Sequence, residues 1–144
     1  RFPRRGTGIP RAAMKREELR LYLLARPEAW EDYPFGPRVA VFKIRSKMFA
    51  TLIEDEGLVR MNLKCDPHEA MILRDIFVSV GPGYHMNKRH WNTVIVDGSI
   101  PDGEIQRMVD SSYGLVVSAL KSSERKALEV QHGKAALYPA QPVP

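Results

Sequence analysis

The sequence predicts a two-layer α+β domain in which an antiparallel sheet carries helices on one face. Five short runs are apolar or alternate between apolar and polar residues, with polar breaks of hairpin size between most of them. Segments with apolar residues at helical spacing stand where this series of strands is interrupted. Strands that meander, with helices at the breaks, are typical of an antiparallel sheet covered on one side. The expected order of elements is α-β(3)-α-β(2)-α.

Residues 15–26 form the first predicted helix, because Leu19, Tyr22, Leu23 and Arg26 share one face and Pro27 ends the pattern. The last helix is expected to begin near Pro101 and Asp102. Its predicted buried stripe consists of Ile105, Met108, Val109, Ser112, Tyr113, Val116 and Leu120.

The middle helix is predicted from its start signal. Asp66 can cap the first turn, Pro67 suits the first helical position, and Glu69 would complete a capping box. We expect this helix to continue to about Arg74. The five predicted strands around it are residues 39–44, 48–53, 58–63, 78–86 and 91–96.

The ordered domain is expected to span residues 14–128, between a leader at 1–13 and a flexible tail at 129–144. The leader mixes Pro, Gly and Arg without any apolar period, and Met14 offers a natural start of translation. The chain carries a net charge of +5, of which the leader supplies +4, while residues 14–128 hold 17 basic and 16 acidic side chains. Bulk charge in the domain is therefore no argument for a polyanionic partner.

Several classes of protein are excluded by composition. The apolar runs are too short to span a bilayer, and the sequence shows no secretory signal, so we expect no membrane association. A single cysteine, Cys65, excludes an internal disulfide and a site with several thiolate ligands, and we expect it to be a small buried side chain. A reducing, cytoplasmic location is the default expectation.

The densest polar segment of the chain is residues 81–92, with two His, one Lys, one Arg, two Asn, a Tyr and a Trp. His85 and His90 lack an acidic or thiolate neighbour at ligand spacing, so we expect no metal. Nearby serine and threonine hydroxyls lack the context of an activated nucleophile, and the Gly81-Pro82-Gly83 spacing lacks the other parts of a phosphate loop. We therefore predict a non-enzymatic protein without a cofactor.

Two basic turns support a nucleic-acid hypothesis, because cationic hairpin tips can follow phosphates while an aromatic ring stacks or wedges. The candidate residues are Lys43, Arg45 and Lys47 in the first tip and Lys88, Arg89, His90 and Trp91 in the second. The alternative for each tip is that exposed turns are charged in any case, with Trp91 anchoring the sheet. Trp30, Tyr33 and Phe35 are expected to pack over the end of the first helix, and a shallow ligand groove at these residues is the alternative, for which the sequence offers no support.

The segment from Pro82 to Val94 resembles a pattern of the MmcQ/YjbR family, similar to Gly-Tyr-His-x-Asn-Lys-x-His-Trp. The resemblance extends over residues 14–125, including Trp30-Glu31-Asp32-Tyr33-Pro34-Phe35-Gly36 and Ser112-Tyr113-Gly114-Leu115-Val116. It implies a YjbR-like fold close to secretion-chaperone and frataxin (CyaY)-like shapes. It also implies a DNA-binding role based on two hairpin wings.

Two functional hypotheses follow. The first is a protein that binds DNA with little sequence preference, in which the cations of both tips contact phosphate and His90 and Trp91 lie against sugar or base. The alternative is a module that binds a small ligand or a protein partner, with a pocket for an anionic group formed by Tyr84, His85, Asn87, Lys88 and Trp91. DNA binding requires two basic tips on one exposed face, whereas a pocket requires His and Trp side chains turned inward. The oligomeric state is not predicted.

Overall fold

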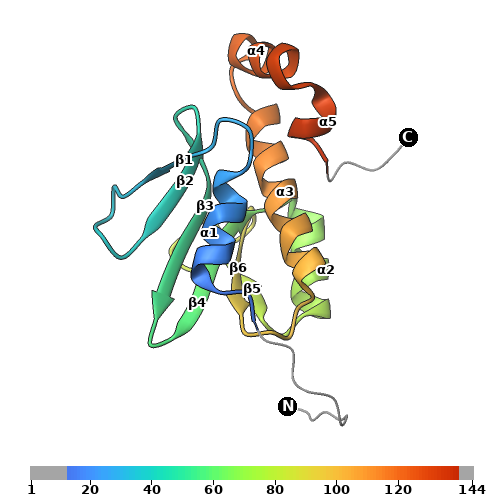
Figure 1. Ribbon diagram of the computed structural model, residues 1–144. Coiled ribbons are helices and arrows are strands. Elements are labelled where there is room, and N and C mark those ends of the chain that lie inside the picture. The colour runs from blue at the N-terminus through green and yellow to red at the C-terminus, as the bar shows by residue number, and fades with distance from the viewer. Residues whose placement is uncertain (1–12, 140–144) are drawn as a thin grey trace.

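A computed structural model of the protein describes residues 13–139 and confirms the α+β fold (Figure 1). Its six strands form one antiparallel sheet in the order β1-β2-β3-β4-β6-β5. The elements in chain order are α1 (Arg16–Leu24), β1 (Trp30–Asp32), β2 (Ala40–Ile44), β3 (Lys47–Asp55), β4 (Leu58–Lys64), α2 (Pro67–Ile76), β5 (Val80–Pro82), β6 (Trp91–Val96), α3 (Asp102–Ser118), α4 (Ser122–His132) and α5 (Lys134–Leu137). The predicted order is therefore present, with one additional strand and two additional helices.

The additional strand is β1, which pairs with β2 at the edge of the sheet. Only three residues long, it has no alternating pattern from which a strand could be predicted. Tertiary contacts hold it in place, since the Trp30 indole N–H donates to the carbonyl of Arg45 at 2.8 Å and the Lys43 ammonium donates to the Asp32 carboxylate at 2.8 Å. The expected packing of the aromatic residues over the end of α1 is wrong, because Trp30, Tyr33 and Phe35 are exposed.

The C-terminal helices correct the expected end of the domain. The side chains of Leu128 in α4 and Leu137 in α5 are fully buried, and the Tyr138 hydroxyl donates to Glu129 at 2.8 Å. The expected flexible tail at 129–144 is therefore wrong for residues 129–139, whereas residues 140–144 and the leader up to residue 12 lie outside the described residues. These helices were missed because each buries only one side chain, which leaves no apolar stripe to detect.

The core lies between one face of the sheet and the helices, of which α1 and α3 lie across that face in Figure 1. All seven residues of the predicted stripe are buried, six of them on α3 and Leu120 just after its end. The Ser112 hydroxyl donates to the carbonyl of Phe49 at 2.6 Å and accepts from the amide N–H of Lys64 at 2.8 Å, which joins α3 to two strands. The Phe49 and Tyr113 rings meet edge to face at 5.2 Å.

Two local expectations around α2 had different outcomes. Asp66 caps the helix as expected, accepting from the backbone N–H groups of His68 and Glu69. The expected capping box is absent, because the Glu69 carboxylate instead accepts from Arg107 on α3 at 2.9 Å. Within the described part of the chain, none of the helices is long and apolar enough to cross a lipid bilayer.

The opposite face of the sheet, here called the open face, carries the alternate residues of the same strands. Thr51 on β3 lies opposite Asn62 on β4, and Asn62 lies opposite Thr93 on β6. This register aligns three polar side chains across the middle of the sheet, because residues directly opposite each other on neighbouring strands point to the same face.

Candidate functional site

The segment between β5 and β6, residues 83–90, carries most of the predicted site residues. Its two ends are held together where the Gly83 N–H donates to the carbonyl of Trp91 at 2.9 Å. A Cβ atom on Gly83 would lie 2.8 Å from Trp91 Cβ and 3.0 Å from the Trp91 carbonyl oxygen, so a side chain cannot be added without displacing the loop. Gly83 and Trp91 thus form the closed base of this loop.

Two of the predicted polar residues serve the loop itself. The Asn87 side-chain oxygen accepts from the Arg89 N–H at 2.9 Å, which is a local turn of the Asx type. The Lys88 ammonium donates to the Gly83 carbonyl at 3.0 Å. Arg74 on α2 also holds this loop, because its guanidinium donates to the carbonyls of Lys88 and Trp91. The side chains of Asn87 and Lys88 are therefore occupied by contacts within the loop.

The side chains of Tyr84 and His85, unlike those of Asn87 and Lys88, make no hydrogen bond within the loop. Their rings lie 4.0 Å apart between centroids, tilted by 48°, and both side chains are exposed. His85 has a φ of 59°, in the left-handed region that non-glycine residues adopt at an energetic cost. Only the backbone of Tyr84 is anchored, since its N–H donates to the Thr93 hydroxyl at 2.9 Å. The loop therefore presents two aromatic side chains that its own stability does not require.

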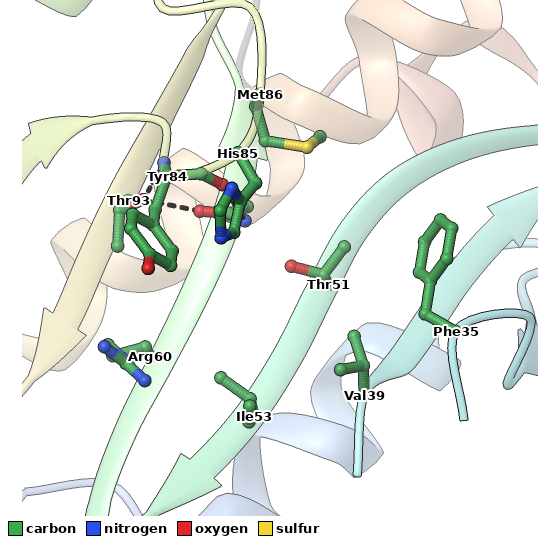
Figure 2. Close-up of a pocket in the computed structure, with 10 residues that line it drawn as sticks. Phe35, Val39, Thr51, Ile53, Arg60, Tyr84, His85, Met86 and Thr93 are labelled. Atoms are coloured by element: carbon green, nitrogen blue, oxygen red, sulfur yellow. Dashed lines mark hydrogen bonds between the residues drawn. The ribbon is translucent and has the colours of Figure 1, made fainter. Parts of the chain in front are cut away.

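These side chains stand at the edge of a groove of about 340 Å³ on the open face (Figure 2). We call it the open-face groove. Figure 2 shows Thr51 and Ile53 on β3 between two sides of the groove, with Tyr84, His85 and Met86 on one side and Phe35 and Val39 on the other. The residues that line it are Phe35, Val39, Thr51, Ile53, Arg60, Asn62, Tyr84, His85, Met86 and Thr93.

Most of the groove surface is apolar, with a few polar groups at defined places. Asn62 and Thr93 are bonded to each other, because the Thr93 hydroxyl donates to the Asn62 side-chain oxygen at 2.5 Å. Thr51 is only 7% exposed, and its hydroxyl makes no hydrogen bond within residues 13–139. An apolar hollow of this size with a small number of polar groups is the usual form of a small-molecule site.

The first basic tip is partly neutralised by carboxylates. Lys43 is paired with Asp32 at 2.8 Å, and Arg45 forms an ion pair with Glu28. Hydrogen bonds hold the pKa values of both acids below their ordinary range: the Lys43 ammonium acts on Asp32, while the His132 ring and then Arg45 act on Glu28. Lys47 is exposed and makes no ion pair within the described residues. One of the three predicted cations of this tip is therefore free of a carboxylate.

The two tips lie at the same end of the sheet. Lys64, at the end of β4, is opposite Trp91 at the start of β6, and the neighbouring strand β3 begins at the first tip. The second tip also borders a hollow of about 320 Å³, lined by Pro67, His68, Met71, Arg74, Lys88 and Arg89. Its lining contains basic side chains and no carboxylate.

The structure places only some of the predicted pocket residues at the open-face groove. Tyr84 and His85 line the open-face groove, whereas Asn87, Lys88 and Trp91 do not. His90 is half-buried, and its carbonyl accepts from the Cys65 N–H at 2.8 Å. Thr51, Ile53 and Arg60 were missed, because they come from separate segments that only the sheet brings together. Alternation along residues 48–53 and 58–63 was the one sequence pattern that could have indicated them. Phe35 belongs to the aromatic group at which a shallow groove was the sequence-based alternative.

Cys65 is buried, as the sequence predicts. Burial raises the pKa of the Cys65 thiol to about 11, so this side chain is neutral at physiological pH and packs as an apolar group. Within residues 13–139, no group of three or more His, Cys, Asp or Glu side chains is arranged to hold a metal ion.

Comparisons with known proteins agree with the sequence resemblance. The sequence model of the YjbR family matches residues 24–115. The chain is 37% identical to the uncharacterised protein YjbR of Escherichia coli K12 over 111 residues, which cover 77% of this chain and 94% of that protein. It is 38% identical to YbdF of Escherichia coli O157:H7 over 94 residues, covering 65% of this chain and 77% of that protein.

Solved structures show the same similarity. The Deinococcus radiodurans protein DR2400, described as a DUF419 domain, superposes with a TM-score of 0.72 at 35% identity, covering 78% of this chain and 86% of that one. A Pseudomonas syringae protein gives a TM-score of 0.62 at 28% identity, covering 71% of this chain and 98% of that one. From the matched segment and the identities to these relatives, the chain belongs to the YjbR family.

Proposed function

We propose that this protein binds a small molecule in the open-face groove. The observation that carries the proposal is the pair Tyr84–His85, held at the groove edge on a loop that does not need their side chains for its own closure. The proposal modifies the second of the sequence hypotheses, because the pocket is formed with the strands β3 and β4 instead of with Lys88 and Trp91.

The test is titration of the full chain with the fluorescent probe 8-anilinonaphthalene-1-sulfonate, which has an aromatic body and one negative charge. Ile53→Glu places a carboxylate in the groove, and we expect it to weaken probe binding by about fivefold or more. Ile76→Glu on α2 is the matched control, since Ile76 is an exposed isoleucine outside the groove.

Thermal unfolding of both variants, followed by circular dichroism, checks that each is folded. Loss of probe binding in Ile76→Glu, with binding retained in a folded Ile53→Glu, would overturn the proposal. It would assign the probe to the apolar surface of α2.

DNA binding is the second candidate, and the position of both basic tips at one end of the sheet supports it. Lys88 and Arg89 also border a hollow whose lining holds basic side chains without carboxylates. The first tip contributes less, because Lys43 and Arg45 already have carboxylate partners. The contacts would be to phosphate, with little discrimination among sequences. Both candidates assume the cytoplasmic location proposed from the single cysteine.

Fluorescence anisotropy of a labelled 20-base-pair duplex, with the full chain at two salt concentrations, tests this candidate. We expect the double variant Lys88→Ala/Arg89→Ala to weaken binding and to reduce the slope of log K against log salt by about 1 to 2. The control Lys121→Ala/Lys126→Ala, at the N-cap and within α4, removes the same charge elsewhere. An equal slope in both double variants would reject the second tip as the contact.

A further inference from the structure

The charge of the open-face groove indicates the class of molecule that it takes. Among the ten lining residues Arg60 is the one permanently charged side chain, and none of the ten is acidic. We propose that the ligand is a planar aromatic anion whose charged end binds Arg60. This inference rests on the proposed function and specifies its ligand.

Arg60 is available to an anion because its contact within the protein is weak. Its guanidinium lies 3.4 Å from the Asp55 carboxylate, whereas Arg38 lies closer to that carboxylate, at 3.0 Å. A guanidinium has five N–H donors in a planar fork that matches a carboxylate. Asp55 contacts Arg60 at one long distance, and the other donors of this guanidinium have no partner within residues 13–139, so they are available to a ligand.

The aromatic character of the ligand follows from the side chains around the groove. The Tyr84–His85 ring pair borders one side and Phe35, which is 68% exposed, borders the other. Ile53 lies between them on β3. Flat rings bury well against such surfaces and gain from offset or edge-to-face contacts with aromatic neighbours.

Thr51 adds a polar position on the floor of the groove. Its hydroxyl is directed into the groove in Figure 2, and its side chain is more than nine-tenths buried without a hydrogen-bond partner within residues 13–139. Buried hydroxyl groups in proteins are normally paired. A polar atom on the body of the ligand would form the hydrogen bond that this hydroxyl lacks, while Arg60 binds the anionic group.

Isothermal titration calorimetry of the full chain with 2-naphthoate and 2-naphthamide tests the inference, since the two probes have the same ring system and differ in charge. We expect 2-naphthoate to bind about tenfold more tightly. Arg60→Gln should abolish this preference, and Asp55→Asn should increase it by removing the competing carboxylate. Lys126→Gln, an exposed cation on α4, has the same net charge as Arg60→Gln and should retain the preference.

Equal affinity for both probes, with both lost in Ile53→Glu, would overturn the anionic class and leave groove binding intact. A preference that survives Arg60→Gln would overturn the role of Arg60. If neither probe binds while Ile53→Glu still weakens binding of the anilinonaphthalene sulfonate, the planar carboxylate is rejected and the groove is retained. If that sulfonate is also insensitive to Ile53→Glu, the proposed function itself fails.

Discussion

The two faces of the sheet are built from alternate residues of the same strands, yet their side chains are used differently. On the helix-covered face, Phe42, Leu52 and Met61 are fully buried, and the polar Ser112 that reaches this face from α3 is bonded on both sides. On the open face, Ile53 and Arg60 are half-buried, and the buried hydroxyl of Thr51 is unpaired within the described residues. The helix-covered face thus supplies the core, while the open face keeps a buried hydroxyl without a partner within residues 13–139. That difference suggests where a ligand would bind.

The largest expected difference is between two neighbouring residues of β3. Leu52→Ala creates a cavity in the core and should lower the free energy of unfolding by about 2–5 kcal/mol. Ile53→Ala removes a half-buried side chain from the open face and should cost less than about 1.5 kcal/mol. Urea denaturation of both variants measures the difference. Equal losses would show that the open face is also part of the core.

Two buried hydroxyl groups offer the next contrast. Ser112→Ala leaves the Phe49 carbonyl and the Lys64 N–H without their partner and should cost about 2–3 kcal/mol. Thr51→Val removes an unpaired hydroxyl and keeps the shape of the side chain, so we expect stability to change by less than about 0.5 kcal/mol. A large loss of stability in Thr51→Val would mean that this hydroxyl has a structural partner and is not reserved for a ligand.

Two glycines next to the groove extend the comparison to the loop. Gly83→Ala brings a methyl group within 2.8 Å of Trp91 Cβ and should cost about 1–3 kcal/mol while displacing Tyr84 and His85. Gly81→Ala on β5 meets no atom within 4 Å and should be neutral or slightly stabilising. Thermal unfolding gives the stabilities, and probe fluorescence shows whether the groove edge has moved. Unchanged probe binding in a destabilised Gly83→Ala would show that the groove does not depend on the closed base of the loop.

The smallest expected effect concerns the pH dependence of the first basic tip. The pKa of Glu28 is lowered in the folded chain by the His132 ring and by Arg45, so its stabilisation is complete above about pH 4.5 and is lost as the pH falls through the lowered pKa. Glu28→Gln should cost less than about 1 kcal/mol at pH 7, because the pair is partly exposed and is screened by solvent. The variant should also lose less stability than the wild type below pH 4.5.

Denaturation curves between pH 3 and pH 7 measure this effect. Glu56→Gln, an exposed acid of the β3–β4 turn without an ion pair in the described residues, is the control. A parallel pH dependence of Glu28→Gln and the wild type would contradict the assigned contact with Arg45 and His132.

The sequence by itself determined the α+β class, the order of five strands and three helices, and the buried stripe of the last helix. One of these strands was predicted too long, since only Val80–Pro82 of residues 78–86 is a strand and the loop begins at Gly83. These features could be predicted because periodicity of two or of 3.6 residues records which face of an element is buried, and a cap such as Asp66 acts within one turn of the chain. The resemblance in residues 82–94 likewise indicated the family before any fold was known. Local patterns carry this information because their physical causes are local.

Tertiary structure decided the rest. The strand β1 and the helices α4 and α5 depend on contacts with residues distant in the chain, such as Trp30 with Arg45 or Leu137 with the core. The open-face groove depends on strand register, which brings Thr51, Arg60 and the loop carrying His85 together from separate segments. The ion pairs that neutralise Lys43 and Arg45 also join residues that are far apart in the chain. Charge in a turn is visible in the sequence, but only the folded chain decides which acid lies beside it.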